Sequence, residues 1–210
     1  MAALYQKIGY IYQQTSQFEK ALEAYNKADI IQPDDIWTVR KMALCYRLSG
    51  NFEKALEFYQ HVDYLRPNQN SVLMQIAHCF VELRKFKEAL SIYFKLDALE
   101  GENIKVWRAI TWCSFVSGNI KQADYYVSKL VENEPNVQDF MNAAHIAWCQ
   151  KKHTEAINLY RRSIELQENN RDLFLGAFNE DKSYLIANGI DKDEIPLMLD
   201  ALLVAVSSKQ

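Results

Sequence analysis

Apolar and polar residues follow one another along this chain with the period of an α-helix. In the segment FEKALEAYNKADII, residues 18–31, apolar side chains stand at Phe18, Leu22, Tyr25 and Ile30. Spacings near one or two helical turns place such residues on one face, which predicts an amphipathic helix. Its beginning is written three times, as QFEKAL from residue 17, NFEKAL from 51 and KFKEAL from 85, at intervals of 34 residues. The pattern therefore predicts a helical unit that is repeated.

The period divides most of the chain into five units, at residues 2–35, 36–69, 70–103, 104–136 and 137–170. Gly50 and Gly118 fall where the first helix of a unit should end, a place that favours a left-handed residue. Prolines follow the second helix in three units and stop it. The twentieth position is always alanine, because a larger side chain would force the two helices apart at a cost of about 1–3 kcal/mol. These alanines are Ala21, Ala55, Ala89, Ala123 and Ala156.

The period ends after residue 170. RDLFLGAFNEDKSYLIANG predicts a longer helix that ends at Gly189, and IDKDEIPLMLDALLVAV predicts another. We expect residues 171–210 to form a capping helical hairpin that covers the last repeat, as repeat proteins require. The final helix is apolar enough to leave a second interpretation open, in which it mediates weak self-association.

The repeated positions resemble those of the tetratricopeptide repeat, a 34-residue helix–turn–helix unit. The first unit carries the pattern at Tyr5, Ile8, Gly9, Tyr12, Ala21, Tyr25, Ala28 and Pro33, and the fourth at Trp107, Ile110, Gly118, Ala123 and Pro135. The resemblance covers residues 2–170, and the fifth unit fits it most loosely. It implies an all-α fold, a right-handed α-solenoid of five repeats over residues 1–170, followed by the capping helices.

Composition narrows the function further. The 210 residues include 24 Lys and Arg against 27 Asp and Glu, a formal net charge of −3, which disfavours a dedicated nucleic-acid binder. No apolar run reaches the roughly 18 residues that span a bilayer. Cys45, Cys79 and Cys113 share one repeat position, and stacked helices lie too far apart for disulfides between them. We therefore expect unpaired thiols and a cytoplasmic location. The chain reads as helix from its start, so we expect it to begin inside a longer protein.

Motifs of catalysis are missing from the sequence. The six glycines are scattered, and HExxH, CxxC and GxSxG do not occur. His78 and His145 lie two repeats apart, too distant to share a metal ion. We expect no enzymatic activity, no cofactor, no metal and no small-molecule substrate.

The resemblance implies that the first helix of each repeat lines a concave surface. The positions it carries over are Gln6, Tyr10, Gln13, Trp37, Arg40, Leu44, Arg47, Met74, His78, Val81, Lys105, Arg108, Trp112, Phe115, Met141, His145 and Trp148. Tryptophan, arginine and methionine are enriched at protein interfaces, and tryptophan and arginine are frequent hot spots. We therefore predict a groove that binds a peptide or protein segment through apolar anchors flanked by arginines. For Phe115 and Trp148 an inward orientation between the helix pairs is an equal alternative.

Two other functions stay open at this stage. The chain could be a structural or self-associating segment of a larger protein, and the solution mass would separate that case. Helical repeats with arginine and stacking aromatic residues can also bind RNA, although the acidic balance disfavours it.

Overall fold

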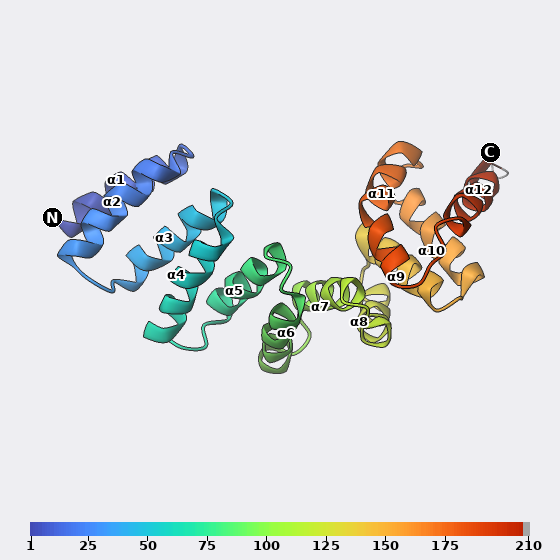
Figure 1. Ribbon diagram of the computed structural model, residues 1–210, viewed down its shortest axis with the longest axis horizontal. Coiled ribbons are helices and arrows are strands. Elements are labelled where there is room, and N and C mark those ends of the chain that lie inside the picture. The colour runs from blue at the N-terminus through green and yellow to red at the C-terminus, as the bar shows by residue number, and fades with distance from the viewer. Residues whose placement is uncertain (208–210) are drawn as a thin grey trace. The chain divides into compact units, whose positions relative to one another are not determined.

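The computed structural model describes residues 1–207, with side chains up to residue 202. Within this range the chain forms twelve α-helices and no strand (Figure 1). The helices belong to two compact units, Met1–Leu99 and the part from Glu100 onward. The prediction of an all-α helical-repeat solenoid is confirmed.

The first unit contains three helix pairs. Their helices are α1 (Ala2–Gln14), α2 (Phe18–Ile31), α3 (Ile36–Leu48), α4 (Phe52–Leu65), α5 (Asn70–Glu82) and α6 (Phe86–Glu100), the last of which ends at the border of the unit. Val39, Tyr59 and Ile76 meet in one part of the core, and Tyr25 and Met42 in another. Ala21, Ala55 and Ala89 have no exposed surface, which explains the requirement for a small residue at this position.

Each first helix of a pair ends at a residue with left-handed backbone. These residues are Ser16, Gly50, Arg84, Gly118 and Lys151, with φ of 56°, 79°, 56°, 80° and 61°. After Gly50, the amide of Asn51 donates to the Tyr46 carbonyl at 2.9 Å, which satisfies one of the free carbonyls at the helix end. The left-handed caps predicted at Gly50 and Gly118 are confirmed, whereas the other three carry no glycine to announce them.

The second unit contains two further pairs and the two closing helices. Its helices are α7 (Ile104–Val116), α8 (Ile120–Glu132), α9 (Val137–Cys149), α10 (His153–Glu165), α11 (Arg171–Ala187) and α12 (Glu194–Ser207). Phe174, Phe178 and Leu185 of α11 are fully buried in the same hydrophobic core as Ile146 of α9 and Ile164 of α10. Residues 139–148 of α9 are buried without interruption. The helix α9 is therefore enclosed on all sides.

The closing helices are tied to the repeats by specific contacts. Asn188, just after α11, donates from Nδ2 to the Phe115 carbonyl at the end of α7, at 3.0 Å. Ile195, Met198 and Leu202 of α12 are buried in the same core. The apolar side chains after Leu202, on which the predicted self-association partly depends, lie outside the described residues. Among the residues that are described, no helix is both long and apolar enough to cross a membrane.

Candidate partner-binding site

A groove lies on the first unit between α3 and α5, with α4 at its floor. We call it the first-unit groove and define it by Trp37, Arg40, Lys41, Leu44, Arg47, Tyr59, Ser71, Met74 and Gln75. Its volume is about 410 Å³. Trp37, Arg40, Leu44 and Arg47 share one face of α3 because their spacing approximates whole helical turns. The groove is therefore built mainly by first helices of successive pairs.

The polar part of the first-unit groove is positively charged. Arg40, Lys41 and Arg47 line it, and no acidic residue does. Arg40 donates from Nη2 to the Ser71 hydroxyl on α5 at 3.1 Å, whereas the Arg47 Nε is buried without a hydrogen-bond partner. Burial raises the pKa of Tyr59, and a hydrogen bond from Arg47 opposes that rise. The arrangement favours an anionic group.

The apolar part of the groove begins at Trp37, which is 43% exposed. Its ring meets the edge of the buried Tyr25 ring, with centroids 5.9 Å apart and planes at 78°. The Lys41 Nζ lies 5.4 Å from the Trp37 ring centroid and 5.1 Å from that of Tyr10. Leu44 and Met74 are half-buried and complete the apolar lining. Trp37 is thus a large aromatic side chain that is held in place while half of it remains open to a partner.

A second, more apolar hollow adjoins the groove at the start of α1. Ala3, Gln6, Lys7, Tyr10 and Ile11 line it together with Trp37 and Lys41, around about 590 Å³. Gln6 donates from Nε2 to the Asp35 carboxylate at 3.0 Å and to the Thr38 hydroxyl at 2.8 Å. These bonds connect the inner faces of α1 and α3, so the two hollows form one surface of the first unit.

The structure brings together six of the first-unit residues that the sequence selects. Tyr10, Trp37, Arg40, Leu44, Arg47 and Met74 line the two hollows. His78 does not line them; it is half-buried, with Nε2 3.6 Å from the Glu82 carboxylate. Gln13 is buried, where it accepts a hydrogen bond from the Tyr25 hydroxyl at 3.0 Å. Sequence reasoning missed Lys41, Tyr59, Ser71 and Gln75, of which only Lys41 carries a signal, as a cation beside Arg40.

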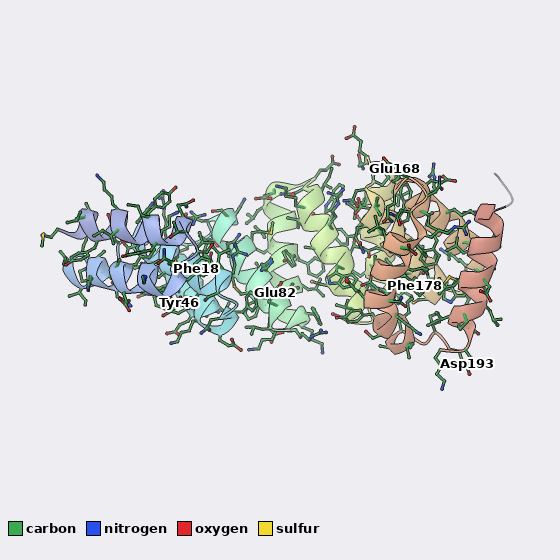
Figure 2. All side chains as sticks on the ribbon, turned by 90° about the horizontal axis from the view of Figure 1, so that it is seen from above. Phe18, Tyr46, Glu82, Glu168, Phe178 and Asp193 are labelled. Atoms are coloured by element: carbon green, nitrogen blue, oxygen red, sulfur yellow. The ribbon has the colours of Figure 1, made fainter. Side chains whose placement is uncertain are left out.

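In the second unit four of the selected residues lie in the core. Phe115, Met141 and His145 have no exposed surface, and Trp148 is almost fully buried. The prediction that they line an open groove is corrected here. The reason is α11, which lies against α9, so that the Phe178 ring, labelled in Figure 2, approaches the His145 ring to 5.7 Å. The His145 Nδ1 lies 2.7 Å from the Tyr160 hydroxyl, and its Nε2 3.2 Å from the Asp181 carboxylate.

Three selected residues of α7 keep access to solvent. Lys105 is exposed and lines no pocket, while Arg108 and Trp112 are half-buried. Arg108 pairs with Asp139 of α9, with Nε at 2.9 Å from Oδ1 and Nη2 at 2.7 Å from Oδ2. A smaller hollow of about 350 Å³ lies beside this pair. We call it the second-unit pocket, lined by Arg108, Trp112, Gln138, Asp139, Asn142, Ala177, Glu180 and Asp181.

The reactive side chains of the chain are deeply placed. Burial raises the pKa of Cys45 and Cys79 to about 11 and that of Cys113 to about 12. It lowers the pKa of His78. In the described part of the chain, no three His, Cys, Asp or Glu side chains are grouped to hold a metal ion. The site therefore offers charged and apolar surface for binding.

Two family models match the chain. The model described as "Tetratricopeptide repeat" matches residues 2–35 and 140–170. The model described as "Anaphase-promoting complex, cyclosome, subunit 3" matches residues 32–96. No curated protein matches the chain significantly.

Solved structures resemble this one in fold. MamA of Desulfovibrio magneticus RS-1, residues 41 to the end, superposes with a TM-score of 0.74 at 16% identity, over 80% of this chain and 96% of that one. YrrB, described as "a TPR protein with an unusual peptide-binding site", gives 0.71 at 17% identity, over 85% and 92%. A tetratricopeptide repeat protein from Parabacteroides merdae ATCC 43184 gives 0.63 at 18% identity, over 96% and 84%. At these identities the likeness concerns the fold.

Proposed function

Because the chain belongs to the tetratricopeptide repeat family, we propose that its first unit binds a short acidic segment of another protein in the first-unit groove. Proteins of this family generally act as scaffolds that bind other proteins or peptides, without catalytic activity of their own. The acidic character of the segment and its seat in the groove are specific to this chain and rest on its side chains.

The charge of the groove is the observation that carries the proposal. Three cationic side chains face the same hollow without an acidic neighbour in its lining, although acidic residues outnumber basic ones in the whole chain. Carboxylates of a bound segment would supply the missing counter-charges. Guanidinium groups are well suited to this, because each can donate two parallel hydrogen bonds to one carboxylate.

An apolar anchor on the segment would use the rest of the groove. Trp37, Leu44 and Met74 expose apolar surface between the cations. A large aromatic residue that is already held by packing loses little freedom on binding, which makes Trp37 suited to be a hot spot. We therefore expect the segment to carry a leucine or a similar residue between its carboxylates.

The closing helices support placing this function in the first unit. In the second unit α11 covers the inner side of α9, and Arg108 is engaged with Asp139. A long partner segment would have to displace buried side chains such as Phe178 there. The first-unit groove needs no such displacement.

Two matched 12-residue peptides test the proposal. One carries a central leucine flanked by Asp and Glu, and the other has the same sequence with Asn and Gln in place of the acids. We expect the acidic peptide to bind the protein at least tenfold more tightly, a difference of about 1.4 kcal/mol, in fluorescence anisotropy at 0.15 M salt. Arg40→Gln should weaken this binding about tenfold. Arg66→Gln is the matched control, because Arg66 is exposed on the first unit outside the groove.

Equal affinity for the two peptides, or equal effects of Arg40→Gln and Arg66→Gln, would contradict the proposal. A 12-nucleotide single-stranded RNA serves as a further competitor, and stronger binding of the RNA would favour the nucleic-acid alternative instead. The solution mass, measured alongside, would reveal self-association if it exceeded that of one chain.

A further inference from the structure

We propose that the second-unit pocket binds a basic side chain of a partner, and that it prefers arginine to lysine. This pocket belongs to the second unit alone, and the inference does not depend on the first-unit groove. Its chemistry is opposite to that of the groove, because acidic residues dominate its lining.

Charge is the first argument. Asp139, Glu180 and Asp181 line the pocket, against the single cation Arg108. Arg108 and Asp139 neutralise each other through their bidentate contact, and Asp139 is only 1% exposed. Glu180 and Asp181 are then left on the α11 side of the pocket. Glu180 is exposed and has no printed ion-pair partner among the residues that the structure describes.

The Asp181 carboxylate is the second and independent argument. This side chain is 8% exposed, and its Oδ2 is engaged by the His145 ring. Its Oδ1 has no hydrogen-bond donor within the described part of the chain, although it belongs to a residue that lines the pocket. Leaving one acceptor of a largely buried carboxylate unpaired is costly, typically about 1–3 kcal/mol for such groups. A donor that enters the pocket would remove this cost.

The aromatic wall of the pocket specifies the kind of donor. Trp112 is half-buried, and its ring is fixed by the edge of the Tyr184 ring at 5.4 Å and by Phe115 at 6.0 Å between centroids. A planar guanidinium can lie against an indole face while its N–H groups point sideways to carboxylates. An ammonium group is smaller and more strongly hydrated, so it uses such a wall less well.

The size of the pocket fits one side chain better than a whole ligand. Its volume of about 350 Å³ stands at the lower end of the range for small-molecule sites, about 300–1,000 Å³. It has no enclosed apolar lining to hold a larger molecule, since most of its residues are polar or charged. A single arginine projecting from a partner meets these conditions.

The test uses N-acetyl-arginine amide as the probe, with N-acetyl-lysine amide and the neutral N-acetyl-glutamine amide beside it. Each is titrated into the full chain, and the indole N–H signals of the four tryptophans are followed by NMR, with Trp112→Phe to assign the signal of Trp112. We expect the arginine probe to shift the Trp112 signal, the lysine probe to bind at least threefold more weakly, and the glutamine probe to cause no shift.

A charge-matched pair of variants separates a built pocket from general attraction to an acidic protein. Glu180→Gln removes a carboxylate from the pocket, and Glu165→Gln removes an exposed one on α10 outside it. The Kd of the arginine probe should rise at least fivefold in Glu180→Gln and less than twofold in Glu165→Gln. No shift of the Trp112 signal, or equal effects of the two variants, would overturn the proposal. Both positions are exposed, so each variant should keep the circular dichroism of the parent.

Discussion

Arg108 of α7 holds the Asp139 carboxylate of α9 edge to edge, and the same carboxylate accepts the backbone amide of Asn136 at 2.9 Å. Asp139 therefore caps the helix on which it lies and ties that helix to the preceding first helix. Arg40 occupies the equivalent place 68 residues earlier, and it donates to Ser71 at the start of α5. Gln6, a further 34 residues earlier, donates to Asp35 and Thr38 at the start of α3. One repeat position thus connects successive pairs, and a partner competes for it.

Removal of the Arg108–Asp139 pair should destabilise the second unit. Arg108→Ala leaves a carboxylate that is 1% exposed without its counter-charge, which we expect to cost about 3 kcal/mol of unfolding free energy. Asp139→Ala removes the pair and one part of the helix cap, at a similar cost. In urea unfolding the double variant should lose about 1–3 kcal/mol less than the sum of the two single variants. Additive losses would mean that the two side chains do not interact.

Two glycines in helices should respond to alanine in opposite directions. A Cβ at Gly9 would lie 2.6 Å from Cε1 of Tyr25, whose ring is fully buried and has no room to move. We expect Gly9→Ala to lower the unfolding free energy by about 1–3 kcal/mol. A Cβ at Gly176, in the exposed part of α11, would meet nothing within 4 Å, so Gly176→Ala should raise it by about 0.5–1 kcal/mol. The same sign for both variants in urea unfolding would disprove the packing described at Gly9.

The left-handed caps predict a stabilising glycine. Lys151 has φ of 61°, a conformation that costs a side-chain-bearing residue about 1–2 kcal/mol. Lys151→Gly should therefore stabilise the chain by about 0.5 kcal/mol after the greater entropy of the unfolded glycine is counted. Lys151→Ala keeps the strained backbone and is the control, with an expected change within about 0.5 kcal/mol. Gly50→Ala should destabilise by about 1 kcal/mol, and thermal unfolding of the three variants measures all of these effects.

The buried thiols predict a loss of stability in alkaline solution. Burial raises the pKa of Cys45, Cys79 and Cys113 above the ordinary value of 9.0, to about 11, 11 and 12. A raised pKa means that the unfolded chain releases its proton first, so stability is complete below pH 9 and falls as pH rises toward 11. Each thiol contributes roughly 1 kcal/mol to this loss at pH 10. The fall between pH 8 and pH 10 should be smaller in Cys113→Ala by about that amount, and an unchanged fall would contradict the burial of this thiol.

Much of the fold could be predicted because the repeat places the same packing problem at the same interval. Ala21 and its equivalents are required by the close approach of two helices, and Gly50 and Gly118 by left-handed backbone. These requirements are local, so the sequence states them directly. Ser16, Arg84 and Lys151 adopt the same cap without glycine, because the hydrogen bonds that close the helix end tolerate a moderate strain there.

The candidate site could be predicted only where nothing distant covers it. Trp37, Arg40 and Leu44 line a groove because neighbouring repeats alone shape that surface. Phe115 and His145 hold equivalent positions, but α11 covers them through contacts between residues 30 or more positions apart. No periodicity connects α11 to α9, so the covering could not be read from the repeat. The pairing of Arg108 with Asp139 was hidden for the same reason.

The most direct test of the account is the place where an acidic, leucine-containing peptide binds. Titration of the peptide into the ¹⁵N-labelled full chain should shift the indole signal of Trp37 and the amide signals of residues 37–47 and 71–75, while the signals of Trp107 and Trp148 stay in place. Trp37→Ala should weaken the binding at least tenfold without changing the helix content. Shifts concentrated in the second unit, or spread evenly over the chain, would contradict the claim that the first-unit groove is the binding site.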